Sequence, residues 1–280
     1  MDTPAPFAQM DTPAPSAQMD TPAPFAKMDA SPPVPDADGG VVSGEDPIEI
    51  VSDGDVVLVV GTRKRKIQVS SHFLKHISPV FRAMIDTPMK EGEALANKCD
   101  DDAPVEIVLP KDKAMTMAQL LSTLYGSDPG AKRLSIAEVK KMVLLAAKYE
   151  MIERIEIFSS FWLRNAAKRD NPEVTENDEN ALTVAFLLNN DQAFYDLTLS
   201  MQYGQDSLLK LAKGFNDKYT GLRLRLAIEE VRRASSDDRN EHGGKMGLCL
   251  FCFSRATESF VRKRADCPSP ERHFEWLRQE

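Results

Sequence analysis

Cysteine is scarce in this chain. Four cysteines among 280 residues are far fewer than small secreted domains use for a disulfide scaffold. The sequence also lacks any apolar run near the roughly 18–20 residues that span a bilayer. No basic segment followed by an apolar run begins the chain, as it would in a secretory signal. We therefore expect an intracellular protein, in the cytoplasm or the nucleus, with reduced thiols and no membrane contact.

The recognisable motifs of catalysis are missing as well. The sequence has no GxGxxG, no Walker loop, no GxSxG and no HExxH. His72 and His76 have the i, i+4 spacing that can place two metal ligands on one helix face, but no third ligand lies nearby in the sequence. Catalysis needs a nucleophile, base or metal brought together with its partners. We predict no enzyme, no catalytic residue and no bound cofactor.

Positive charge is not concentrated enough for a general nucleic-acid binder. The net charge is −8, and the first 45 residues hold seven acids and one lysine. Phosphate binding needs a concentrated basic face. The short basic runs Arg63–Lys66 and Arg262–Arg264 are typical of solvated turns, with nuclear import as the alternative.

A tandem repeat fills the N-terminus. MDTPAPFAQ, MDTPAPSAQ and MDTPAPFAK follow one another directly, and MDASPPVPD is a degenerate fourth copy. Frequent proline removes amide donors and favours extended backbone, and the segment has little apolar surface to offset the entropy of ordering. We predict that residues 1–45 are disordered, as a tolerant linker or as a set of repeated proline motifs.

Regular structure is predicted from residue 52 onward. Val56–Val60 is a short β-branched run and Ile67–Val69 alternates, so Asp55–Val69 is predicted to be a hairpin. Ser70 or Ser71 can cap a first short helix, and Ser78-Pro79 begins a second. The acidic stretch 86–104 is predicted to be a loop, and Val105–Leu109 is a further strand.

Helices are predicted to dominate the rest of the chain. Asp112 can cap a helix that ends at Gly126, and Ser135 with Glu138 forms a capping box for the next. Another helix is predicted from about Glu150 to Trp162. Beyond Asn171-Pro172 we find four apolar sets of helical spacing and no strand: Leu182–Leu188, Phe194–Leu197, Leu208–Phe215 and Leu222–Val231. Ser235–Asp238 and Gly243-Gly244 are predicted to form a hinge.

This order of elements resembles a BTB/POZ domain. Leu74, the Ser78-Pro79-Val80-Phe81 run and Met84 are similar to the helical-hairpin signature of that family, and Leu120–Tyr125 and Leu144–Tyr149 resemble its later helices. The Ser70-Ser71 pair is similar to fungal members, where many relatives have a histidine. The resulting fold class is α/β (α+β), a BTB/POZ-like domain with a C-terminal all-helical extension and a disordered N-terminal tail. The predicted segments are 1–45, 46–170 for the domain, 175–234 for the extension and 235–280 for a Cys/His-containing tail.

The resemblance implies a non-enzymatic scaffold or adaptor that binds protein partners. Some members bind a cullin scaffold through a hydrophobic-x-Glu motif, which Met89 and Glu91 match, so a substrate adaptor of a cullin-type ubiquitin ligase is an alternative. Some relatives also exchange an N-terminal strand in a homodimer. Only Ile48–Ile50 fits that strand here, and a homodimer therefore stays open.

The tail carries a second candidate site. Cys249, Cys252, Cys267 and His273 have the spacing C-x2-C-x14-C-x5-H. Two thiolates of a Cys-x-x-Cys pair can reach one ion, and a distant pair can complete a tetrahedron. Structural zinc is one interpretation, and it would support a transcription- or chromatin-associated regulator. Apolar packing of the cysteines beside Phe251 and Phe253, or a redox-sensitive pair, are the alternatives.

Overall fold

Among the described residues, a sheet and the helices that cover it come first. The computed structural model describes residues 46–87, 90–97, 103–164, 174–202, 215, 217–237 and 245–273. Within these residues four strands form one sheet in the order β1-β3-β2-β4. The strands are β1 (Ile48–Glu49), β2 (Val56–Val60), β3 (Arg65–Val69) and β4 (Val105–Leu109).

The predicted hairpin is confirmed. Strand β2 pairs antiparallel with β3, with Val56 opposite Val69 and Val60 opposite Arg65. On its other side β2 pairs parallel with β4. The short strand β1 pairs parallel with β3, at the one position where the sequence offered an N-terminal strand. Every residue of β2 is buried, as its unbroken β-branched run predicts.

The next helices are α1 (Ser71–Ile77), α2 (Pro79–Asp86) and α3 (Lys90–Ala96). Ser78 caps α2 as predicted, since its side chain accepts from the Phe81 N–H with Pro79 at the first helical position. Ser70 is the N-cap of α1 but makes no side-chain cap bond. The carboxylate of Asp55 takes that role, accepting from the backbone N–H and the hydroxyl of Ser71.

The prediction of a loop throughout residues 86–104 is wrong, because α3 lies within it. This segment is rich in charge, and it has neither a long apolar stripe nor a capping residue that the sequence pattern could identify. Helix α3 nevertheless packs against the end of α2 and against β4. Tertiary contact decides its conformation where local pattern is weak.

The helices that follow are α4 (Ala114–Tyr125), α5 (Ile136–Lys148), α6 (Ile152–Ile155) and α7 (Ser159–Trp162), with 3-10 turns at Ala131–Arg133 and Glu156–Phe158. The capping box of Ser135 and Glu138 is confirmed, and Gly126 ends α4 with a left-handed φ of 83°. The single helix predicted from about Glu150 to Trp162 is wrong. Short α-helical and 3-10 pieces replace it.

Asp112 does not cap α4, contrary to prediction. The helix begins after Lys113, which makes no side-chain cap bond. The Asp112 carboxylate instead accepts from Lys148 Nζ at 2.5 Å and from the Tyr149 hydroxyl at 2.6 Å. These two bonds join the start of α4 to the end of α5.

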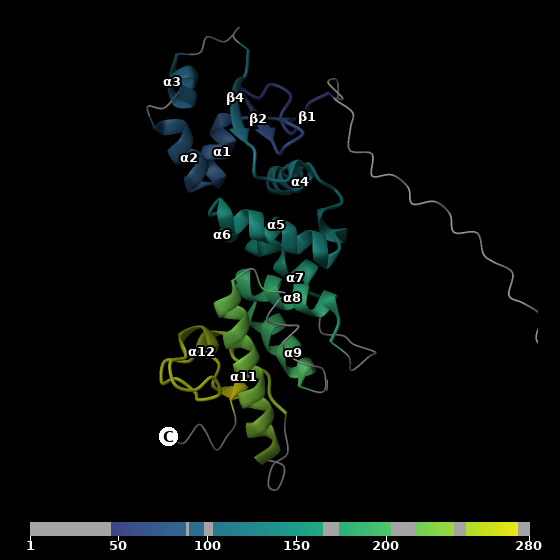
Figure 1. The fold of residues 1–280 in the computed structure, drawn as a ribbon, viewed down its shortest axis with the longest axis vertical. Helices are drawn as coiled ribbons and strands as arrows, with labels where there is room; N and C mark the ends of the chain where they lie inside the picture. Colours follow the sequence, from purple (N-terminus) through teal and green to yellow (C-terminus); the bar gives the residue numbers. More distant parts are fainter. Residues whose placement is uncertain are drawn as a thin grey trace, which may run out of the picture. The chain divides into compact units, whose positions relative to one another are not determined.

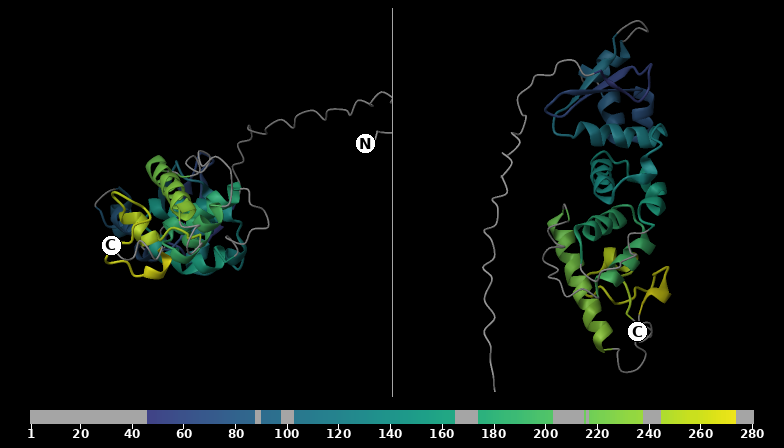
Figure 2. Two further views of the ribbon diagram at one scale, coloured as in Figure 1. Left: turned by 90° about the horizontal axis from the view of Figure 1, so that it is seen from below. Right: turned by 90° about the vertical axis from the view of Figure 1, so that its right-hand side faces the viewer.

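The described residues of the C-terminal half include α8 (Glu176–Leu187), α9 (Asp191–Met201), α11 (Lys218–Asp237) and α12 (Leu250–Arg255), with a 3-10 turn at Pro270–Arg272. No strand occurs among its described residues, as predicted. Helix α8 packs against α5 on one side and against α9 on another (Figure 1). Residues 245–273, which we call the C-terminal segment, lie beside α11 (Figure 2).

Two details of α11 differ from the sequence pattern. The predicted apolar set included Leu222 and Leu226, which are exposed, whereas Leu224, Ile228 and Val231 are buried. Residues 235–237 form the end of α11, so the hinge predicted from Ser235 does not begin there. Gly243 and Gly244 lie outside the described residues.

Several predictions fall where the structure gives no description. The N-terminal repeats at residues 1–45 and the apolar set at 208–211 lie outside the described residues. The described residues all belong to one compact unit, residues 44–280. The finer division at about 170 and 235 stays a prediction. Among the helices of the described ranges, none combines the length and apolar character that a membrane crossing requires.

Ser78→Ala should destabilise the protein more than the same change at Ser135. The buried Ser78 hydroxyl donates to the Tyr149 carbonyl at 2.7 Å and accepts from the Phe81 N–H at 3.1 Å, so its loss leaves two buried backbone groups without that partner. We expect a loss of about 2–3 kcal/mol. Ser135→Ala removes an exposed cap and should cost about 1 kcal/mol. Denaturant unfolding of both variants measures the difference, and equal losses would contradict the assigned role of Ser78.

Candidate functional site

The first candidate site lies among the helices that pack on the sheet, where α2 contacts the end of α5. The Phe81 and Tyr149 rings stack with centroids 4.6 Å apart. The Ser78–Tyr149 bond lies beside this pair. Burial is the main cause that raises the pKa of Tyr149 above its ordinary value, and the Asp112 bond adds to it. The phenol therefore stays protonated as a donor to Asp112.

One of the two predicted partner-binding residues lies at the beginning of α3. Glu91 is in the first turn of that helix, whereas its side chain and the whole of Met89 lie outside what the structure describes. The helix approaches the end of α2 closely at Gly92. A Cβ there would come within 2.2 Å of the Thr87 carbonyl oxygen and 2.7 Å of the Ile85 carbonyl oxygen. Glycine is therefore needed at this position.

His72 and His76 do not form a site. Both are exposed on α1, and they take no part in the group of metal-ligand type found among the described residues.

A family comparison bears on this half of the chain. The BTB/POZ domain model matches residues 52–166. Residues 52–166 form a BTB/POZ domain. Comparisons with curated proteins and with solved structures gave no match. The resemblance drawn from the Ser78–Phe81 run and the later helices is confirmed, and the similarity to fungal members stays a prediction.

The second candidate site lies in the C-terminal segment, in which the structure brings together all four predicted ligands. Cys249 precedes α12 as its N-cap, and Cys252 lies in the first turn of that helix. Cys267 follows a turn in which its N–H donates to the Arg264 carbonyl. His273 follows the 3-10 turn at 270–272. Their ligand atoms lie within 4.8 Å of one another.

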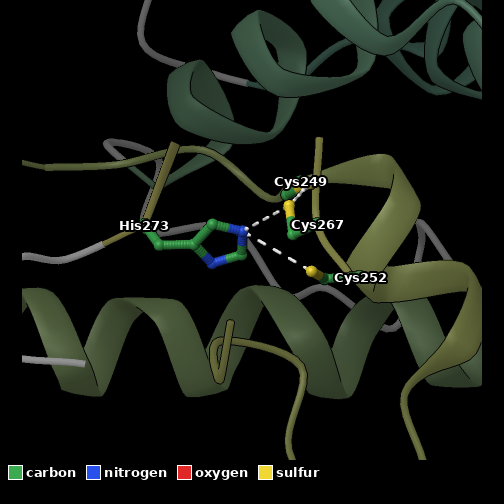
Figure 3. A group of neighbouring side chains, drawn as sticks. All are labelled: Cys249, Cys252, Cys267 and His273. Atoms are coloured by element: carbon green, nitrogen blue, oxygen red, sulfur yellow. Dashed lines mark hydrogen bonds between the residues drawn. The ribbon is translucent and has the colours of Figure 1, made fainter. Parts of the chain in front are cut away.

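Three separations within this group, which we call the Cys3His cluster, are close to uniform. The sulfurs of Cys249 and Cys267 are 3.7 Å apart. Nε2 of His273 is 3.5 Å from the Cys252 sulfur and 3.4 Å from the Cys267 sulfur. Figure 3 shows the imidazole pointing toward the thiols. The three cysteines are free rather than joined in a disulfide.

Three of the four ligands are buried, and Cys267 is partly exposed. Cys249, Cys252 and His273 are 2%, 1% and 3% exposed. Burial raises the pKa of the Cys249 thiol to about 12 and raises the pKa of Cys252. A buried thiolate at neutral pH thus needs a compensating positive charge.

The segment that holds the cluster is fixed to the helices around it. Arg223 of α11 donates to the Phe253 and Ala256 carbonyls at 3.0 Å each. The Leu248 N–H donates to the buried Thr198 hydroxyl of α9. At Gly247 the backbone passes so close to α9 that a Cβ would lie 2.1 Å from the Tyr195 carbonyl oxygen.

Gly92→Ala should disturb the packing of α3 against the end of α2. The added Cβ would clash with two backbone carbonyl oxygens, which cannot move without a shift of the backbone. We expect a loss of about 1–3 kcal/mol in the free energy of unfolding, with faster hydrogen exchange in α3. Gly130→Ala is the matched control, since a Cβ there meets only the Asp128 side chain, at 3.1 Å. Equal stability of the two variants would show that α3 does not pack on α2 as described.

Proposed function

We propose that this chain is a non-enzymatic adaptor whose BTB/POZ domain binds a protein partner. The observation that carries the proposal is the family match over residues 52–166, on a fold whose strands and helices agree with it. BTB/POZ domains are protein-interaction modules. Self-association through the same domain is part of the proposal, and light scattering of the full chain measures it.

Exposed apolar side chains on the domain mark where a partner can gain affinity. Met84 on α2 is 36% exposed and Met115 at the start of α4 is 69% exposed. A buried methionine side chain contributes on the order of 1.5–3 kcal/mol, and a few such residues dominate most interfaces. The two methionines lie on different helices, so each can be tested separately.

Met84→Glu should abolish capture of the partner, because Met84 lies on the helix that leads into α3 and the predicted binding residues. Met115→Glu is the comparison variant, and loss of capture there but not in Met84→Glu would place the contact on α4 instead of α2. The experiment is affinity purification of the full chain from cells, with the bound proteins quantified by mass spectrometry, and a thermal melt of each variant verifies folding. If no bound protein depends on either methionine, the proposed surface is wrong.

The second candidate function is a substrate adaptor of a cullin-type ubiquitin ligase. Two observations favour it. Glu91 lies in the first turn of a helix at the end of α2, which gives the Met89-Lys90-Glu91 run a defined backbone on its C-terminal side. Helices α8 and α9 pair directly after the domain, and α8 packs on α5, as a helical extension of an adaptor would.

Glu91→Ala should weaken binding of a cullin N-terminal domain by about tenfold, or about 1.4 kcal/mol. The control is Glu93→Ala, since Glu93 lies on the same helix and is exposed. Titration calorimetry with the full chain measures both. Absence of binding by the wild type would exclude the cullin function and leave the general adaptor proposal standing.

A transcription- or chromatin-associated regulator is the third proposal and has narrower support. It rests on the Cys3His cluster and on the neighbouring Arg262–Arg264 run, in which Arg264 is paired with Asp266 at 3.1 Å. Three of the four ligands are buried, so a nucleic-acid surface would have to come from the basic run.

A further inference from the structure

We propose that the Cys3His cluster binds a single structural Zn²⁺ through Cys249, Cys252, Cys267 and His273, and that this ion fastens the C-terminal segment to α9 and α11. The proposal is independent of the partner of the BTB/POZ domain. It rests on the positions of four side chains, on the groups around them and on the lack of extensive regular structure in residues 245–273.

The separations fit an ion at the centre of the cluster. Bond lengths of about 2.3 Å for Zn–S and about 2.0–2.1 Å for Zn–N place two sulfurs about 3.8 Å apart in a regular tetrahedron, and sulfur and nitrogen about 3.6 Å apart. Three of the six separations, at 3.7, 3.5 and 3.4 Å, match those edges within a few tenths of an ångström, and all six lie within 4.8 Å. Hydrogen-bonded thiols approach to similar distances, but a hydrogen-bonded pair does not require four potential ligands to converge.

The groups around the ligands have the arrangement that zinc sites use. Nδ1 of His273 lies 3.4 Å from the Val261 carbonyl oxygen, which orients the ring with Nε2 toward the sulfurs. A second-shell carbonyl of this kind fixes the tautomer that leaves Nε2 free to coordinate.

A metal ion at this site would add a link between the C-terminal segment and the rest of the protein. Between residues 245 and 273 the structure has one six-residue helix and one 3-10 turn. Next to His273, Arg272 pairs with Asp191 of α9 and donates to Gln192 at 2.9 Å. A metal that holds His273 therefore also holds Arg272 on α9, and metal binding of this kind contributes to folding free energy.

Four protein ligands leave no open coordination position, so the site is structural and not catalytic. Binding displaces the protons of the three thiols and forms three Zn–S bonds and one Zn–N bond. No electron is transferred, and no oxidant or reductant is needed. A Cys249–Cys267 disulfide would require an oxidant and would remove two of the four ligands.

The test uses the full chain, purified under reducing conditions without a metal-affinity tag. Elemental analysis should find zinc in equimolar amount, and native mass spectrometry should show the mass of one Zn²⁺. In the wild type, alkylation of Cys249, Cys252 and Cys267 should be slow until a chelator is added. Co²⁺ in place of zinc should give the charge-transfer absorption of several thiolate ligands.

Cys267→Ser and His273→Gln should weaken zinc retention by more than about tenfold, because even loss of an outer-shell partner costs roughly 10–100-fold. His72→Gln and Cys99→Ser are the matched controls and should retain zinc. Equimolar iron in place of zinc, no bound metal in reduced wild type supplied with Zn²⁺, a Cys249–Cys267 disulfide, or full retention in both ligand variants would each overturn the proposal. The alkylation and metal measurements on the wild type decide the matter even if a ligand variant fails to fold.

Discussion

Strand β2 sets the main constraint on the first half of the molecule. All five of its residues are buried, so both faces of the sheet must be covered and both edges of β2 must be paired. Strands β3 and β4 supply the pairing. Helix α4 contacts β3, and α3 contacts β4. The buried contact of Ser78 with Tyr149 then ties α2 to the end of α5, which joins an early helix to a late one.

Helix α8 has a comparable position in the second half. Seven residues of this helix between Asp178 and Ala185 are buried, and they include the polar residues Asp178 and Asn180. A helix buried on more than one side must contact several neighbours, and α8 contacts α5 and α9. Lys140 of α5 donates to Asn180 at 2.9 Å, and burial lowers the pKa of this lysine. The domain and its helical extension thus share buried surface.

The sequence predicts best where one local rule decides the structure. The β-branched run of β2, the Ser78-Pro79 cap and the Ser135–Glu138 capping box are all of this kind. Prediction from the sequence fails where contacts between residues far apart in the chain decide the structure. Helix α3 depends on α2 and β4, and Asp112 is drawn away from α4 by Lys148 and Tyr149. For the Cys3His cluster, spacing identifies the residues, but only the packing of Gly247, Arg223 and Arg272 explains how ligands up to 24 positions apart come together. No sequence signal identifies Arg223 as the residue that holds α12.

The contact between α5 and α8 has a practical consequence for work with fragments. The family match ends at residue 166, ten residues before α8 begins. A fragment cut at that boundary would present to solvent the side of α5 that α8 covers in the full chain. Newly exposed apolar surface promotes association. Dimers or aggregates formed by such a fragment would then reflect where it was cut, and only the longer chain would report the protein's own oligomeric state.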